Sequence, residues 1–172
     1  GFVFYGGFFG ALIPSLIFTR LKKQDISQWL DVFAPIAALG YMIGRLATLL
    51  SGSGYGKPTD LPWGVIYPPG TEAPFGMALH PTPIYSCLWE LFILVLILVI
   101  ERAGRKGIWK APGALFYTFI IWHSLGRAFI EQFRDDFRGE LVWGLTVSTQ
   151  LSFIVALIAV GLWVAKIVRQ PK

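Results

Sequence analysis

The chain contains five blocks in which hydrophobic residues dominate and charged residues are rare. They cover residues 2–18, 32–50, 84–100, 113–133 and 145–168. A transmembrane helix needs about 20 apolar residues, with about 17 as the lower limit. Backbone groups in lipid must be satisfied within the segment, which favours helices over open strands. The pattern therefore predicts an all-α integral membrane protein, a single domain over residues 1–172 with about five transmembrane helices. The first and third blocks are near the limit, so a short or interfacial segment is an alternative there.

A long segment rich in glycine, proline and aromatic residues, residues 51–82, separates the second and third blocks. Its prolines, in "YGKPTDLPWGVIYPPGTEAPFG", exclude a long helix. A loop of this length in a compact protein is usually functional or disordered. Trp63, Tyr67 and Phe75 argue against simple disorder. Aromatic residues also gather at the headgroup level of membrane proteins, so an interfacial cap is the plainer interpretation.

Composition and charge support membrane insertion and give it a direction. The chain is 55% hydrophobic and 15% charged, whereas a soluble domain is about 25% charged. Ten of the 15 Lys and Arg residues lie in segments 20–23, 102–110 and 166–172, which follow the first, third and fifth blocks. The positive-inside rule places these segments in the cytoplasm. We therefore expect the start of the chain outside, loop 51–82 outside, and the C-terminus in the cytoplasm.

The same features argue against several other classes of protein. The net charge of +5 comes from residues that flank apolar blocks, so we expect no nucleic-acid partner. One cysteine excludes a disulfide framework within the chain. Two distant histidines and one cysteine make no metal-ligand pattern, so we expect neither metal nor cofactor. The chain begins with glycine and shows no signal-peptide pattern, which leads us to expect an N-terminally trimmed chain.

Two arginines fall inside the predicted spans. An arginine at mid-span costs about 2.5–3.5 kcal/mol on insertion scales. Arg45 lies in the outer half of the second block, where snorkelling towards the interface is an alternative. Arg127 lies inside the fourth block, with Glu131 four residues later and Arg134 seven residues later, and an internal ion pair is its alternative. Two guanidiniums near one leaflet suit a phosphodiester, because each offers a planar fork of donors.

Other residues give weaker signals. The glycine clusters at residues 5–7 and 52–56 lie at outer helix ends, where a headgroup could approach the backbone, although small residues also serve helix packing. His80 precedes the third block and is a proton carrier, a lid residue or a structural residue. For His123, a neutral imidazole bonded to a neighbouring helix is the default. Cys87 is expected to be a small packing residue.

Five segments resemble, in order, the prolipoprotein diacylglyceryl transferases of bacteria. They are "FYGGFFGAL", "DVFAPIAALGYMIGRLATLLSGSGYGKPTDLPWGV", "LHPTPIYS", "LGRAFIEQFRDD" and "GLTVSTQLSFIVAL". The resemblance implies an enzyme of the bacterial inner membrane. Such enzymes move the diacylglyceryl group of phosphatidylglycerol onto the lipobox cysteine thiol of a preprolipoprotein, and glycerol phosphate leaves. No cofactor is implied.

The resemblance also implies roles for individual residues. Arg45 and Arg127 would hold the phosphate as negative charge builds on the leaving group, Glu131 is the acid that follows, and Tyr5 occupies the position of the base. These four form the expected catalytic set. The expected substrate-binding set is Gly6, Gly7, Gly44, Tyr55, Gly56, His80, Tyr85 and Arg134.

The chain departs from the family pattern at several positions. Tyr5 stands where many members have histidine, and Thr48 replaces the signature asparagine. Ser86 replaces a glutamate, although Glu90 follows one turn later. We therefore expect a divergent member, and the alternative is a catalytically impaired paralogue that binds anionic phospholipid or a lipoprotein precursor. A small transporter or channel subunit is a further alternative, but no inverted repeat is apparent.

Overall fold

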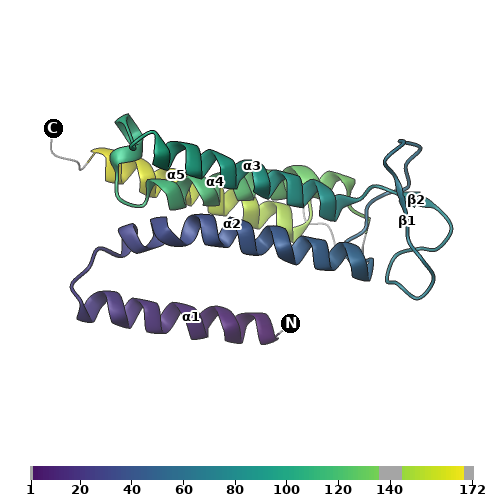
Figure 1. Cartoon of the computed structure of the whole chain (residues 1–172), viewed down its shortest axis with the longest axis horizontal. Coiled ribbons are helices and arrows are strands. Elements are labelled where there is room, and N and C mark those ends of the chain that lie inside the picture. Colours follow the sequence, from purple (N-terminus) through teal and green to yellow (C-terminus); the bar gives the residue numbers. More distant parts are fainter. Residues whose placement is uncertain (1, 136–144, 169–172) are drawn as a thin grey trace.

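The computed structural model describes residues 2–135 and 145–168, with side chains at position 10 and from position 13 onwards. It is mostly helical (Figure 1). The elements of these residues are α1 (Phe2–Leu21), α2 (Ile26–Ser51), β1 (Val65–Ile66), β2 (Ala78–Leu79), α3 (Thr82–Arg102), α4 (Ala114–Ile130) and α5 (Val147–Val168), with 3₁₀ turns η1 (Gly107–Lys110) and η2 (Glu131–Phe133).

Three of these helices are long and apolar enough to cross a membrane, by length and composition. They are α2, α3 and α5. The α4 helix has 17 residues and gives way to the η2 turn at Glu131, so the fourth apolar block is helical over less than its predicted length. The α2 helix starts at Ile26, before the apolar block does, because Asp25 caps it by accepting the Ser27 N–H at 2.9 Å. Five membrane crossings remain a prediction.

The α2, α3, α4 and α5 helices pack as an antiparallel bundle, and α1 lies beside α2 (Figure 1). Small residues let α2 approach its neighbours closely, and Ala34 and Ala38 are fully buried against Ile93 and Ile97 of α3. Gly126 of α4 serves the same purpose for α3, because an added Cβ would lie 2.0 Å from the Trp89 indole nitrogen. Close contacts of this kind are typical of helix packing in membranes.

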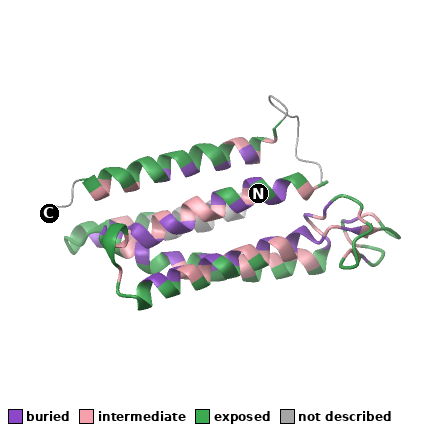
Figure 2. Ribbon diagram, turned by 90° about the horizontal axis from the view of Figure 1, so that it is seen from above, coloured by how far each residue is buried: buried purple, intermediate pink, exposed green. Residues whose placement is uncertain are grey.

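The outer surface of the bundle is strongly apolar. Large hydrophobic side chains such as Leu50, Leu157 and Val168 are 82%, 72% and 77% exposed, and the face of α5 in Figure 2 is exposed over most of its length. Exposed apolar area on this scale is unfavourable in water and favourable in lipid. The structure thus supports membrane embedding of the bundle.

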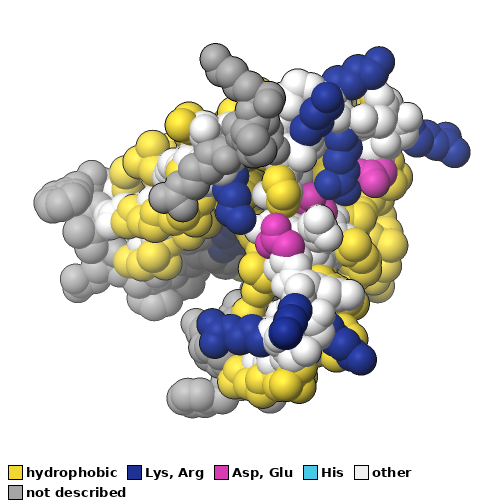
Figure 3. Space-filling view, turned by 90° about the vertical axis from the view of Figure 1, so that its left-hand side faces the viewer, with side chains coloured by type: hydrophobic (Ala, Val, Ile, Leu, Met, Phe, Trp, Pro, Cys, Tyr) yellow, Lys and Arg dark blue, Asp and Glu magenta, His cyan; other side chains and the backbone are white. Residues whose placement is uncertain are grey.

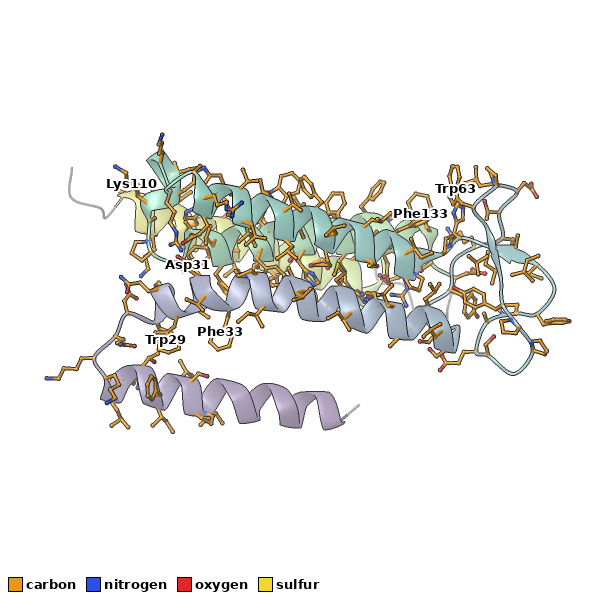
Figure 4. The ribbon with its side chains drawn as sticks, in the orientation of Figure 1. Trp29, Asp31, Phe33, Trp63, Lys110 and Phe133 are labelled. Carbon is orange, nitrogen blue, oxygen red and sulfur yellow. The ribbon has the colours of Figure 1, made fainter. Side chains whose placement is uncertain are left out.

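Basic side chains gather at one end of the bundle. The α1–α2 link, the α3–α4 link and the end of α5 all lie there, and Lys and Arg side chains surround this end in Figure 3. Lys22, Lys23, Arg102 and Lys106 are exposed in these segments. Figure 4 shows Lys110 and Asp31 at the same end. The fold therefore collects the basic segments on one side, as the positive-inside argument requires.

Asp31 caps the start of α4 from the neighbouring helix. Its buried carboxylate accepts hydrogen bonds from the backbone N–H groups of Gly113, Leu115 and Phe116 at 3.1, 2.9 and 3.1 Å. The Arg105 guanidinium donates to the same carboxylate at 2.6 Å. Burial alone would lower the pKa of Arg105, but Glu101 and Asp31 outweigh it and raise that pKa. The cap thus fixes α4, which carries Arg127, to α2.

The opposite end of the bundle carries an ordered loop. Its strands β1 and β2 pair in antiparallel fashion, with Val65 opposite Leu79. Tyr67, Ala73 and Leu79 form a small buried core of their own. Tyr67 is 2% exposed, and burial raises the pKa of its phenol. The absence of a long helix from the described loop agrees with its prolines.

Candidate active site

The guanidiniums of Arg45 and Arg127 meet at one tyrosine hydroxyl. Arg45 of α2 lies over the Tyr41 ring, 4.6 Å from its centroid, and donates to the Tyr41 hydroxyl. Nη1 of Arg127, on α4, donates to the same hydroxyl at 3.3 Å. Nε of Arg127 donates to Ser148 Oγ of α5 at 3.0 Å. Two cations from separate helices are therefore held together inside the bundle.

A narrow polar hollow lies beside this meeting point. Its inner space is about 10 Å³, roughly the room that a single water needs. Residues from α2, α3, α4 and η2, and the residue after η2, line it: Tyr41, Ser86, Trp89, Glu90, His123, Gly126, Arg127, Ile130, Glu131 and Arg134. Glu131 is 7% exposed and accepts a hydrogen bond from Thr146 Oγ1 at 3.1 Å. Oppositely charged side chains thus share one confined space.

The glycine cluster at residues 52–56 holds loop 51–82 against the chain that follows α4 and η2. Gly56 pairs with Arg134 in an antiparallel bridge and donates its N–H to the His80 carbonyl oxygen at 3.0 Å. An added Cβ on Gly56 would lie 2.6 Å from that oxygen. At Gly54, with φ of +66°, an added Cβ would lie 2.7 Å from Arg134 Nη2. Glycine is therefore required at both positions for the loop to lie against Arg134.

Three hydrogen-bonded aromatic side chains connect the loop to α3. Trp63 Nε1 donates to the Tyr85 hydroxyl at 2.9 Å, and Nδ1 of His80 lies 2.9 Å from the same hydroxyl. These side chains line an apolar groove of about 680 Å³ between α3 and α4, with Phe129 and Phe133 on the other wall. Trp63 and Phe133 lie at the loop end of the bundle in Figure 4. Trp89 and Ile130 line both groove and hollow, so the two spaces adjoin.

A buried acid on α3 and a histidine on α4, one helical turn before Arg127, form a further pair. His123 Nδ1 lies 2.6 Å from Glu90 Oε1, and Glu90 is 2% exposed. The His123 ring stacks on Phe119, with centroids 5.4 Å apart, and meets the Tyr41 ring edge to face at 4.7 Å. The predicted bond from His123 to a neighbouring helix is thus present, since Glu90 belongs to α3. The sequence analysis assigned no function to the pair.

Comparison with known proteins identifies the family. Residues 1–165 match the family described as "Prolipoprotein diacylglyceryl transferase". The chain belongs to this family. It is 33% identical over 172 residues to the phosphatidylglycerol–prolipoprotein diacylglyceryl transferase of Clostridium tetani (strain Massachusetts / E88) and 34% identical over 174 residues to that of Geobacter sulfurreducens. All of this chain is covered in both alignments, but only 66% and 63% of those relatives. The chain thus spans about two thirds of their length.

This member of the diacylglyceryl transferase family brings together several of its predicted site residues. Arg45 and Arg127 converge, and Arg127, Glu131 and Arg134 line one hollow. His80 and Tyr85 line the groove, and the Tyr55 carbonyl oxygen accepts the Asp135 N–H at 3.3 Å. Gly44 is exposed, and the described residues leave open space around it. The structure therefore does not bring Gly44 into the hollow.

Three predicted residues lie where the structure gives only the backbone. Tyr5, Gly6 and Gly7 belong to α1, and their side-chain surroundings lie outside the described residues. Tyr41 and Glu90 are the main residues that the sequence prediction missed. A tyrosine in an apolar run gives little signal, but an acid inside the clearest apolar block is a signal, because buried acids in membranes are costly and usually paired.

Proposed function

We propose that the protein transfers the diacylglyceryl group of phosphatidylglycerol to the lipobox cysteine thiol of a preprolipoprotein. The family match and the names of the relatives support this assignment. The chemistry needs an anion-binding site within the membrane, beside space for two acyl chains. Two converging guanidiniums and an adjoining apolar groove among the described residues support the proposal.

The convergence of Arg45 and Arg127 at the Tyr41 hydroxyl carries the proposal. A phosphodiester that entered here would replace the hydroxyl as the shared acceptor of both guanidiniums. Each planar fork can grip two phosphate oxygens, and it remains charged at any working pH. When the glyceryl C–O bond breaks, the phosphate charge grows from −1 to −2, and fixed cations stabilise that change most.

The apolar groove suits the rest of the lipid. Its lining is almost wholly hydrophobic, and it adjoins the polar hollow through Trp89 and Ile130. A phospholipid has the same order, with an anionic headgroup next to apolar chains. In this arrangement the headgroup lies at Arg127 and an acyl chain lies along Phe129 and Phe133.

The proposal places the site in the outer leaflet of the bacterial inner membrane. The bundle collects its basic segments at the end opposite loop 51–82, and such segments favour the cytoplasm. Loop 51–82 then faces outward, where lipoprotein precursors emerge. Tyr5, Arg45, Arg127 and Glu131 remain the proposed catalytic set. The proposed substrate-binding set remains Gly6, Gly7, Gly44, Tyr55, Gly56, His80, Tyr85 and Arg134.

The test is a transfer assay with the full-length protein in nanodiscs. The disc contains phosphatidylglycerol, and the acceptor is a peptide with one lipobox cysteine. Mass spectrometry should show that the peptide gains one diacylglyceryl group. In a control disc with diacylglycerol in place of phosphatidylglycerol the peptide should gain none, because diacylglycerol has no phosphate leaving group. Arg45→Lys and Arg127→Lys should each lower the rate by about 10²-fold or more, and the exposed Arg102→Lys on α3 should not.

Absence of transfer by the parent protein would overturn the enzymatic proposal. The variants would then test the remaining alternative, a paralogue without catalytic activity, because a protein that only binds lipid should still retain anionic lipid. If the parent retains phosphatidylglycerol without turnover and Arg45→Ala releases it, the chain is a lipid-binding paralogue. If Arg45→Lys transfers at the parent rate, the proposal that Arg45 and Arg127 bind one anion is wrong.

A further inference from the structure

The pair formed by Glu90 and His123 has no place in the function described so far. Both side chains line the polar hollow, and their closest polar atoms are 2.6 Å apart. The second carboxylate oxygen of Glu90, Oε2, is buried and has no hydrogen-bond partner in the part of the chain that the structure describes. A buried acid inside a membrane span is costly, so its retention in this position calls for a role.

An ionised Glu90 would give the hydrogen bond between the two groups one direction. An ionised carboxylate can only accept hydrogen bonds. With Glu90 ionised, the hydrogen therefore lies on His123 Nδ1, and the lone pair lies on Nε2. No hydrogen bond to Nε2 is found among the side chains that the structure describes, at position 10 and at 13–135 and 145–168. The His123 side chain is 23% exposed and lines the polar hollow, so the imidazole adjoins the space that a ligand would enter.

We propose that His123, and not the Tyr5 that the family resemblance puts at the base position, accepts the thiol proton of the incoming cysteine, and that Glu90 positions the imidazole for this step. The inference rests on the proposed transferase function and deepens it. His123 lies four residues before Arg127 on α4, a rise of about 6 Å along the helix. Reacting atoms need to lie about 3–3.5 Å apart. His123 and Arg127 line the same hollow one helical turn apart, so a thiol between them could contact the base while it attacks the carbon beside the phosphate.

The step balances without any further reactant. The thiol S–H proton passes to His123 Nε2, and the sulfur forms a bond to the terminal glyceryl carbon of the diacylglyceryl group. The bond from that carbon to the phosphate ester oxygen breaks, and its electron pair leaves with the oxygen. Glycerol phosphate leaves as a dianion, and the imidazolium then returns its proton to that phosphate or to water. Histidine is suited to both parts of this cycle near neutral pH.

Charged and titratable side chains reach the surroundings of His123 from α2, α3, α4, the η2 turn and the residue that follows it. Among the described residues they are Tyr41, Arg45, Glu90, Arg127, Glu131 and Arg134. From α5, Ser148 contacts Arg127 and does not titrate in the working range. Glu90 is the carboxylate in direct contact with the imidazole, so it is the group that stabilises the imidazolium.

The experiment measures kcat and the KM for phosphatidylglycerol between pH 6 and 9, with full-length protein in nanodiscs. His123→Gln and Glu90→Gln are compared with Glu101→Gln, the same change at an exposed site on α3. His123→Gln should lower kcat by about 10²–10⁴-fold at pH 6.5, with little change in KM. The loss should shrink about tenfold per pH unit up to the thiol pKa of about 8.5, because the thiol then ionises unaided. Glu90→Gln should show a smaller loss with the same trend.

The results separate this inference from the proposed function. A parent protein without transfer would refute the function itself, whereas an active parent with a fully active His123→Gln would refute only the inference. A loss that stays constant from pH 6 to 9 would also overturn it, because a purely structural role has no reason to depend on thiol ionisation. Retention of phosphatidylglycerol by each variant shows that the site is intact. Loss of the lipid in both variants would assign the pair to structure and overturn the proton role.

Discussion

Replacing Asp31 with alanine should destabilise the bundle far from the proposed site. Asp31 accepts four hydrogen bonds, three from backbone N–H groups at the start of α4 and one from Arg105. The alanine variant leaves those three N–H groups without their acceptor and the guanidinium without its carboxylate. Removing one partner of a buried pair costs about 3–5 kcal/mol. The Arg105 side chain is 29% exposed and can be rehydrated, so we expect the lower end, about 3 kcal/mol.

A loss of about 3 kcal/mol lowers the equilibrium constant for folding by about 150-fold. For a chain of this size it corresponds to a fall in Tm of roughly 6–12 °C. Thermal unfolding in detergent, followed by circular dichroism at a helical wavelength, measures it directly. Asp25→Ala is the matched control, because the exposed Asp25 caps only its own helix, with one hydrogen bond. Loss of such a cap costs about 1 kcal/mol.

The comparison of the two aspartates decides whether the inter-helix cap matters. If Asp31→Ala and Asp25→Ala lower Tm by the same small amount, the carboxylate does not hold α4 against α2, and the reasoning fails. The Tm of Asp31→Asn should lie between that of the parent and that of the alanine variant. The amide retains one oxygen for the α4 N–H groups but loses the charge that the Arg105 guanidinium and the helix N-terminus favour.

Two further substitutions test the loop. Gly56→Ala should lower the transfer rate at least tenfold, because its Cβ would lie 2.6 Å from a carbonyl oxygen, whereas Gly161→Ala, with open space around it, should transfer normally. Tyr67→Phe should leave Tm unchanged or raise it slightly at pH 7, because the buried hydroxyl has no partner among the described residues. Burial raises the Tyr67 pKa above its ordinary value of 10.0. Ionisation of this phenol therefore leaves the stability of the fold unchanged below pH 10 and lowers it as pH rises through the folded pKa. Hydrogen exchange of the loop should show this loss at high pH in the parent only.

The membrane character of the fold was predictable because it depends on composition summed over long segments. Three helices meet the length and hydropathy of a membrane span, and the basic segments lie together. Helix ends were less predictable. The start of α2 depends on a capping side chain, Asp25, in a polar stretch, and the end of α4 depends on the turn at Glu131. Local hydrogen bonds of this kind decide where a helix begins or ends, and the pattern of apolar residues does not predict them.

Part of the candidate site was also predictable from single residues. A cation inside an apolar block is costly enough to indicate a function, so Arg45 and Arg127 could be singled out before their positions in space were known. The shared acceptor, Tyr41, could not be, because its role depends on the register of α2 against α4. The pairing of Glu90 with His123 likewise needs the packing of α3 on α4, although the acid itself is conspicuous in its apolar block.

Charge balance connects the arginines with the acid–histidine pair. The described residues at the site include the guanidiniums of Arg45, Arg127 and Arg134 and the carboxylates of Glu90 and Glu131. Transfer turns a phosphodiester of charge −1 into a leaving group of charge −2. An imidazolium formed at His123 in the same step adds one positive charge, so the net charge of the region does not change during transfer. If the thiol proton left for bulk water instead, one negative charge would remain uncompensated within the membrane, where charge imbalance costs most.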